Sequence, residues 1–513
     1  MELRPLFTER LSGFREWLRT RNRRRFSMVI AAVMALGLTL IISSSYPPIG
    51  LGETRVAWRI WLGVFLVVLF ELLVGAMYLY RFGGKIREDN NLVLVMATLF
   101  LLFAGIARLL AIPPLSPYII PLAALGMMAT IIFNARTGHL LVALEALNVG
   151  MIAGMDMRFV IVALLVGAFS LYLVSHLTQR SQLVSSGFWV MLAAAFCAFA
   201  VDMLRETAFP LALQSALWGL GNGLLSMVLT LVLLVVFETA FNLSTPLRLL
   251  ELANPAQPLL RRLMQVAPGT YNHSIMMGNL AESAAEAIGA DPLLARVGAY
   301  YHDIGKVTRP EYFIENQLHI TNPHDKLTPS LSRLAIVAHV RDGEMLARQS
   351  GLPQPVVDII RQHHGTSVLS YFYQKAKQNS SEEVPEEEYR YEEEKPATRE
   401  AAIIMLADSV EAAAKSMRNP TLKKLQGLIH EIFKQKMEDG QLDRSQLTFG
   451  DLQKIGEVFD NGLRGMMGHR IEYPWQADTG RGERRLARAA AGRDDERTEP
   501  TEPTETPEDG GET

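Results

Sequence analysis

The stretch YYHDIGKVTRPEYF, Tyr300–Phe313, decides how the rest of the chain is interpreted. It places a histidine beside an aspartate, and a lysine follows about one helical turn after the histidine. Successive residues of an α-helix point about 100° apart, so His302 and Asp303 diverge, whereas Lys306 shares the face of His302. Two adjacent, diverging ligands suit a site with two metal ions, in which Asp303 bridges both ions and His302 binds one of them.

Helical patterns flank this stretch on both sides. TYNHSIMMGNLAESAAEAIG is rich in alanine and ends at Gly289, where a glycine can cap a helix. Strand-like alternation of apolar and polar residues is scarce. The sequence therefore predicts an all-α domain with helices at 270–289, 291–306, 330–351, 353–365 and 398–417, and at least two more between 420 and 465.

Potential metal ligands recur along these helices. Five of the eleven histidines and two aspartates lie on the helices or at their ends: His273, His302, His339, His363, His364, Asp303 and Asp408. A single helical histidine is more often structural, but this many ligands between apolar neighbours predict a metal site inside a helical bundle. Imidazole and carboxylate suit Mn, Fe, Zn or Ni better than Ca. Two ions about 3.5–4 Å apart can clamp a phosphoryl group for in-line attack, and Lys306 could neutralise a phosphate oxygen.

The N-terminal half of the chain is much more apolar than the rest. Hydrophobic residues make up 49% of the 513, and the long apolar runs end near residue 241. The basic segment WLRTRNRRRF before the first run places the N-terminus in the cytoplasm, and an even number of crossings returns the all-α domain to that side. We expect about eight membrane helices, or seven without the short run 139–155; the runs are 27–45, 58–81, 92–112, 117–134, 139–155, 159–176, 187–204 and 213–241.

Three charged residues fall inside these apolar runs. Glu71, Arg108 and Glu145 are candidates for a functional role, because charge inside a bilayer costs a few kcal/mol. The alternatives are hydrogen bonds between helices and interfacial positions. The net charge of −3 gives no indication of a nucleic-acid polymer as a partner. The lone Cys197 excludes a disulfide framework within the chain.

These patterns divide the chain into five parts. We predict a basic cytoplasmic N-terminus (1–26), a block of membrane helices (27–241), a helical connector (242–265), the all-α domain with the metal ligands (266–476) and a disordered polar tail (477–513). Within the all-α domain, the segment 380–396 holds eight glutamates. It is expected to be a solvated loop; the alternative is a flap or partner-contact element, which would stay out of the open site because its charge repels an anionic substrate.

The ligands, in chain order, resemble those of the HD-domain metal phosphohydrolases, and HDIGK marks the HDIG subgroup. APGTYNHS, FIENQ, NPHDKLTPS and QHHGTS are similar, more narrowly, to the bacterial seven-transmembrane HD family, which hydrolyses cyclic di-AMP. The resemblance implies two divalent ions, Mn or Fe. One is held by His273, His302, Asp303 and Asp408, and the other by Asp303, His339, His363 and His364.

The resemblance also implies a reaction and a location. A water attacks a phosphodiester of cyclic di-AMP and opens it to linear 5′-phosphoadenylyl-adenosine, with Asp303 and Lys306 as catalytic residues and with Lys306 and His324 as substrate contacts. The protein is expected in the bacterial inner membrane, where the lipid bilayer is its partner, with the HD domain in the cytoplasm. A homodimer through the helices is compatible with the sequence.

One feature departs from the family and several alternatives remain open. Family members commonly carry a large extracytoplasmic domain after the first helix, where YPPIGLGETRVAW is short, and this puts an external sensing role in doubt. Cyclic di-GMP hydrolases of similar ligand set carry a Gly-Tyr-Pro motif after the paired histidines, which HHGTSVLSYFY lacks. A nucleotide phosphohydrolase is a further alternative. A non-enzymatic membrane receptor or transporter would be expected to lack ligands, and none is missing.

Overall fold

The described part of this computed structural model covers residues 22–46, 54–175, 177, 179–317, 321–417 and 421–466. All of its regular elements are α-helices or 3-10 helices, and an isolated bridge between Val368 and Arg390 is the only extended pairing found there. The prediction of an all-α chain is therefore confirmed. The predicted tail (477–513) and most of the predicted basic N-terminus lie outside the described residues.

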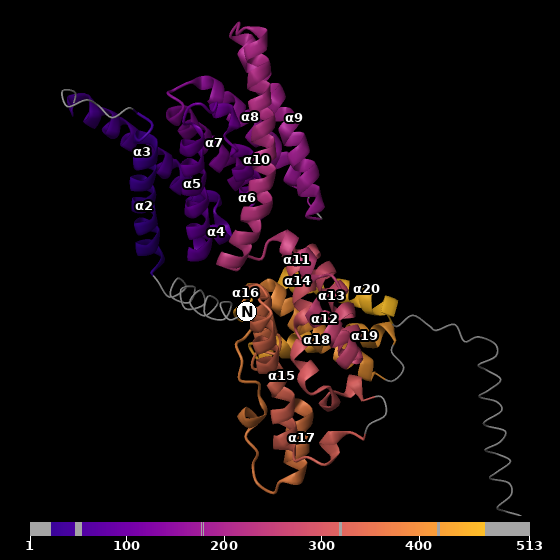
Figure 1. Cartoon of the computed structure of the whole chain (residues 1–513). Helices are drawn as coiled ribbons and strands as arrows, with labels where there is room; N and C mark the ends of the chain where they lie inside the picture. The colour runs from indigo at the N-terminus through magenta and orange to yellow at the C-terminus, as the bar shows by residue number, and fades with distance from the viewer. Residues whose placement is uncertain are drawn as a thin grey trace, which may run out of the picture.

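The helices form two blocks, one above the other in Figure 1. The upper block is the apolar one, because its helices carry hydrophobic residues on nearly every face, as lipid-exposed helices do. Its members are α2 (Arg23–Ser43), α3 (Thr54–Phe82), α4 (Gly84–Glu88), α5 (Asn90–Leu110), α6 (Leu122–Ile132), α7 (Ala135–Ile152), α8 (Met157–Val174), α9 (Ser181–Leu204) and α10 (Phe209–Phe241).

Six helices of the described residues are long and apolar enough to cross a membrane: α2, α3, α5, α8, α9 and α10. The apolar segment Pro117–Ile132, which includes α6, is shorter. Most of α6 is buried among its neighbours, since every residue from Leu122 to Ala129 is buried. The helix α7 occupies the short run 139–155. The six long helices, the segment Pro117–Ile132 and α7 together match the eight apolar runs in order. The chain is a multi-pass membrane protein.

Arg108 shows that one of the three charges in the apolar runs has a structural role. It lies in the last turn of α5, where its Nε donates to Ser44 Oγ at 2.9 Å and its Nη2 donates to the Ser44 carbonyl at 2.6 Å. The arginine therefore ties the end of α5 to the end of α2. Glu71 and Glu145, in contrast, are buried.

The lower block contains the predicted metal ligands. Its α-helices are α11 (Pro246–Leu252), α12 (Pro258–Val266), α13 (Pro268–Ile288), α14 (Pro292–Tyr301), α15 (Pro329–Gln349), α16 (Gln354–Gln362), α17 (Ser370–Asn379), α18 (Arg399–Ser416), α19 (Leu422–Glu438) and α20 (Phe449–Met466). Between them lie the 3-10 turns η2 (Ile304–Thr308), η3 (Pro310–Tyr312), η4 (Ile314–Asn316), η5 (Pro323–Asp325) and η6 (Glu386–Tyr389).

Small residues on α13, α14 and α18 let these helices pack closely around one hydrophobic core, with Ala281, Ala299 and Ala407 fully buried. As predicted, α13 ends at Gly289, whose φ of 66° lies in the left-handed region that glycine adopts without strain. The helix α17 was not predicted; it follows the paired histidines and packs through Phe372 and Ala376.

The second predicted helix ends earlier than expected. The α-helix stops at Tyr301, and a 3-10 turn replaces it from Ile304. The prediction that Lys306 shares a helical face with His302 is therefore wrong. The change of helix type accompanies a close approach of two segments: a Cβ atom at Gly305 would overlap the carbonyl of His339, so the turn η2 lies directly against α15.

The two blocks are joined by a short, hydrogen-bonded connection. Arg180, which precedes α9, pairs with Glu238 near the end of α10 at 2.7 Å and also pairs with Glu251 on α11. Arg248 on α11 donates to the Glu238 carbonyl at 2.9 Å and to the Gly351 carbonyl of the lower block. Charged side chains thus connect the last membrane helix to the lower block.

Close packing of α9 on α10 gives a testable consequence for the membrane block. A Cβ atom at Gly223 would overlap the backbone of Met191, whereas one at Gly221 would meet only Ile119, at 3.6 Å. We predict that Gly223→Ala destabilises the block by about 1–3 kcal/mol, because the helices must separate. The thermal midpoint of the detergent-solubilised protein measures this.

Gly221→Ala is the matched control on the same helix. It should leave the midpoint unchanged or raise it slightly, since alanine is the better helix former. Equal midpoints for the two variants would contradict the packing described here.

Candidate metal centre

The seven predicted ligands converge in the lower block from five parts of the chain. His273 lies on α13, His302 and Asp303 follow α14, and His339 lies on α15. The pair His363 and His364 follows α16, and Asp408 lies on α18. The ligand atoms form two groups, each with its atoms within 4.8 Å of one another: Asp303, His339, His363 and His364 in one, and His273, His302 and Asp408 in the other.

Asp303 lies between the two groups and turns one oxygen to each. Its Oδ2 is 3.2 Å from His302 Nε2 and 4.0 Å from His273 Nε2. Its Oδ1 is 3.4 Å from His339 Nε2 and 3.8 Å from His363 Nε2. The carboxylate is therefore placed to contact an ion in each group.

Backbone carbonyls orient three of the imidazoles. The Nδ1 atoms of His302, His339 and His363 lie 2.7, 2.6 and 2.8 Å from the carbonyls of Ala299, Ile336 and Ile360, respectively. A carbonyl only accepts, so each ring donates from Nδ1 and turns the lone pair of Nε2 toward the centre. Each carbonyl belongs to the residue three positions earlier, so the preceding helical turn orients the ring.

The resulting arrangement fits metal ions. Lone pairs of His339 Nε2 and His363 Nε2 face each other at 3.5 Å, and both face a carboxylate oxygen. The buried atoms His302 Nε2 and Asp303 Oδ1 have no hydrogen-bond partner. Converging acceptors without protons repel one another unless cations lie between them. Imidazole and carboxylate together suit divalent transition metals.

The electrostatic environment favours the metal-binding forms of His363, His339 and Asp303, but it favours the protonated form of His273. Burial lowers the pKa of His363 to about 3 and also lowers the pKa of His339, so both imidazoles are neutral. Burial alone would raise the pKa of Asp303, but His302 and Lys306 outweigh it and hold the pKa well below its usual range. Burial likewise opposes charge on His273, but the hydrogen bonds to Asp408 and Glu411 raise its pKa to about 10.

Lys306 contacts the centre through Asp303 and not through His302. Its Nζ lies 2.7 Å from Asp303 Oδ2 and 2.9 Å from Glu315 Oε1, and it also lies over the Phe313 ring. Burial lowers the pKa of Lys306, but the two carboxylates outweigh it, so the pKa is raised and the side chain stays charged. The lysine therefore compensates the charge of the shared aspartate.

His324, predicted as a substrate contact, lies outside both groups of ligand atoms. It is buried between the rings of Tyr312 and Phe372, and its Nε2 is 2.9 Å from the Tyr312 carbonyl. This environment packs a histidine into the loop that precedes α15. A substrate contact of His324 remains a prediction.

Two residues at the centre were not identified from the sequence. Glu411 accepts from His273 Nδ1 at 3.0 Å and in turn pairs with Lys415. Its spacing of three residues after Asp408 on one helix was a signal that it faces the same way. Tyr391 stacks on His364, with ring centroids 4.3 Å apart, and is nearly fully buried. Nothing in its local sequence indicated this contact.

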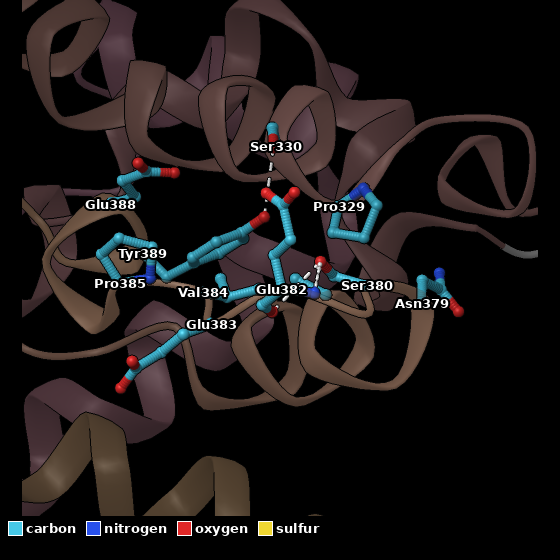
Figure 2. A pocket seen from close by; sticks show the side chains of 11 residues that line it. Pro329, Ser330, Asn379, Ser380, Glu382, Glu383, Val384, Pro385, Glu388 and Tyr389 are labelled. Carbon is cyan, nitrogen blue, oxygen red and sulfur yellow. Dashed lines mark hydrogen bonds between the residues drawn. The ribbon is translucent and has the colours of Figure 1, made fainter.

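The acidic segment 380–396 was expected to stay out of the site. It does reach the centre, through the aromatic ring of Tyr391, which stacks on His364. Its glutamates pair elsewhere: Glu386 with Arg390, Glu392 with Arg333 and Glu394 with Arg361. Figure 2 shows the side chains around a shallow hollow of about 330 Å³ beside this segment, where Ser330 Oγ lies 3.1 Å from the Tyr389 hydroxyl. None of the seven ligands lines this hollow.

The centre opens to solvent on one side. The side chains of His364 and Asp408 are 21% and 17% exposed, whereas those of the other five ligands are at most 7% exposed. A substrate must therefore approach the centre past His364 and Asp408.

Glu411 supports a prediction about metal affinity. We expect Glu411→Gln to weaken binding of divalent metal by roughly 10-fold or more, because the charge that orients His273 is lost. Metal content measured by mass spectrometry after dialysis against graded chelator tests this. Glu286→Gln, on the exposed face of α13, is the control and should retain its metal. Equal retention in both variants would mean that Glu411 does not support the centre.

Comparisons with known proteins agree with this organisation. The family model described as "7TM receptor with intracellular HD hydrolase" matches residues 58–245, and the HD domain model matches residues 270–413. The cyclic-di-AMP phosphodiesterase PgpH of Bacillus subtilis is 41% identical over 365 residues, which are 70% of this chain and 51% of that protein. PgpH of Listeria monocytogenes is 40% identical over 367 residues, with the same coverage.

Two crystal structures of the L. monocytogenes PgpH HD domain also match, one of them in complex with cyclic di-AMP. They are 47% and 48% identical, cover 41% and 42% of this chain and 99% of their own, and have TM-scores of 0.39 and 0.40. The chain spans about half the length of the curated relatives it matches. With its membrane-domain match over α3 to α10 and its HD-domain match over the metal centre, the chain belongs to the seven-transmembrane HD family.

Proposed function

We propose that this protein is a membrane-anchored, dimetal phosphodiesterase that hydrolyses cyclic di-AMP to linear 5′-phosphoadenylyl-adenosine and so lowers the concentration of this second messenger. The observation that carries the proposal is the position of Asp303, whose two oxygens face two separate groups of imidazoles. A carboxylate shared between two ligand sets can hold two ions close together, as two-metal hydrolysis requires. The two PgpH relatives, named as cyclic-di-AMP phosphodiesterases, support the choice of substrate.

The seven predicted ligands would bind two divalent ions. His273, His302, Asp303 and Asp408 would hold one divalent ion, and Asp303, His339, His363 and His364 would hold the other. When bound, these ions supply Lewis acidity toward the phosphate and activate a water as nucleophile at neutral pH. The water oxygen bonds to phosphorus, the bond from phosphorus to the 3′ oxygen breaks, and a proton passes to that oxygen. The product keeps a 5′ phosphate.

Lys306 contributes charge and position. Because it is buried between Asp303 and Glu315, it stays cationic and offsets negative charge as an anionic phosphodiester enters. Tyr391 holds the His364 ring at the open side of the centre. Substrate contacts of Lys306 and His324 are part of the proposal.

The proposal extends to location and metal. The proposal keeps the five parts predicted from the sequence: N-terminus (1–26), membrane block (27–241), connector (242–265), HD domain (266–476) and tail (477–513). The HD domain lies in the cytoplasm beneath the bacterial inner membrane, where the nucleotide is available. Mn and Fe are the proposed metals, and a homodimer is the proposed assembly.

A test of substrate and mechanism uses the full chain in detergent or nanodiscs, loaded with Mn or Fe. Cyclic di-AMP and cyclic di-GMP are incubated separately and the products are resolved by chromatography. We expect only cyclic di-AMP to be opened. Asp303→Asn should reduce turnover by more than the roughly 10–100-fold typical of residues that merely orient ligands, because both ions lose a ligand.

Asp443→Asn is the matched control, since this aspartate is exposed and belongs to neither ligand group. It should keep wild-type turnover. A preference for cyclic di-GMP would be compatible with the metal centre, but it would contradict the assignment of cyclic di-AMP as the substrate. Absence of turnover with both metals bound would favour a receptor without catalysis.

Removal of metal should also lower stability. Ions that bind the folded state alone stabilise it according to their concentration relative to Kd, by about 2.7 kcal/mol at 100 times Kd. We therefore expect chelator to lower the unfolding midpoint of the HD block and Mn or Fe to restore it, in wild type but not in Asp303→Asn. An identical midpoint for metal-free and metal-loaded wild type would exclude a resident metal.

A further inference from the structure

A half-buried lysine in the last turn of α19 has no carboxylate partner among the described residues. Lys436 Nζ donates to Ser367 Oγ at 2.7 Å, and the ion pairs in the described part of the chain do not include this lysine. Asp439, three positions further along, is engaged by Arg390, whose Nη2 lies 2.8 Å from Asp439 Oδ1, and by the side-chain amide of Gln441. The ammonium group is therefore held by a neutral hydroxyl.

The serine that accepts from Lys436 belongs to the turn that presents His364. The Ser367 backbone N donates to the His364 carbonyl at 3.1 Å, and the Ser367 carbonyl accepts from the backbone N of Tyr391 at 3.0 Å. Tyr391 in turn stacks on the His364 ring. His364 and Asp408 lie at the open side of the metal centre. Lys436 is thus bonded to the turn that a substrate must pass.

The same turn is fixed to the end of α19. The backbone N of Gln441 donates to the Lys436 carbonyl at 2.9 Å, while Gln441 Oε1 accepts from the backbone N of Thr366 at 3.0 Å and Gln441 Nε2 donates to Thr366 Oγ1 at 2.8 Å. Arg390 Nη1 donates to the Thr366 carbonyl at 2.8 Å. These bonds hold Lys436 in a constant position relative to His364, which lowers the cost of binding a ligand there.

The charge of Lys436 is poorly compensated in this position. Burial lowers the pKa of Lys436, and the carboxylates of Asp408 and Asp439 oppose that effect only in part. Lys306 differs, because contacts with two carboxylates raise its pKa. A cation that is partly removed from water and lacks a counter-ion favours the binding of an anion beside it.

A cyclic dinucleotide would bring such an anion. It carries two phosphodiester groups in one ring, and a metal centre that cleaves one of them leaves the other to be matched by a cation of the protein. Arg390 and Lys306 already have two carboxylates each. Lys436, beside the open side, has none among the described residues.

We infer that Lys436 binds the non-reacting phosphate of the cyclic dinucleotide, with Ser367 orienting its ammonium group. The inference rests on the proposed function and adds to it a residue that selects the substrate by its second charge. A substrate with a single phosphodiester does not use this contact. Lys436 therefore favours cyclic dinucleotides over molecules that carry one phosphate.

Steady-state kinetics of the full chain in detergent, loaded with Mn, test this contact. Lys436→Gln keeps a donor for Ser367 but loses the charge, so we expect KM for cyclic di-AMP to rise by about 10-fold or more while kcat changes by less than about threefold. Lys436→Arg keeps the charge and should restore most of the affinity. Lys436→Gln should match wild type on bis(p-nitrophenyl) phosphate, which has one phosphodiester.

Lys434→Gln, at an exposed position on the same helix, is the control and should match wild type on both substrates. Turnover of cyclic di-AMP by wild type with an unchanged KM in Lys436→Gln would overturn this inference alone. An equal loss on both substrates, or a loss that Lys436→Arg does not recover, would assign the lysine to support of the centre and would also overturn it. An inactive wild type would contradict the proposed function, and the inference with it.

Discussion

The carboxylate of Asp303 has to stay between two sets of imidazole nitrogens, and much of the HD block serves that requirement. The α-helix before it ends at Tyr301, so the backbone turns and directs the carboxylate between α13 and α15. The 3-10 turn that follows passes so close to α15 that only glycine fits at position 305. The side chain of Lys306, which lies in this turn, contacts Asp303 and compensates the negative charge of its carboxylate. Each step depends on the one before it.

The imidazoles around Asp303 are held by a repeated local device. In three cases a histidine donates from Nδ1 to the carbonyl three residues earlier; His302 and His363 do so at helix ends, and His339 does so in the middle of α15. His273, in the second turn of α13, lacks this arrangement and uses the carboxylate of Glu411 from another helix instead. Three of these ligands are thus oriented by their own helix, and the fourth is oriented by a tertiary contact.

The sequence allowed the all-α class, the order of the helices and the seven ligands to be predicted, because apolar periodicity and the repetition of His and Asp are local signals. The change from α-helix to 3-10 helix after Tyr301 could not be predicted, because it accompanies the contact of Gly305 with α15, far away in sequence. Consequently Lys306 was assigned to the wrong neighbour. Tyr391 was missed for the same reason, since its stacking on His364 depends on how a loop folds back. In the membrane block, hydropathy located the helices but could not show that Glu71 and Glu145 are buried among them.

The connection between the blocks has a consequence for how the HD domain is carried. Asn242 ends α10 in a left-handed conformation, and α11 begins only four residues later. Arg180 and Arg248 bond across this corner to Glu238, Glu251 and Gly351. A flexible linker would let the domain tumble beneath the bilayer, with a reach that grows with linker length. This corner is instead a rigid connection, so the tilt of α10 in the membrane determines the direction in which the metal centre opens.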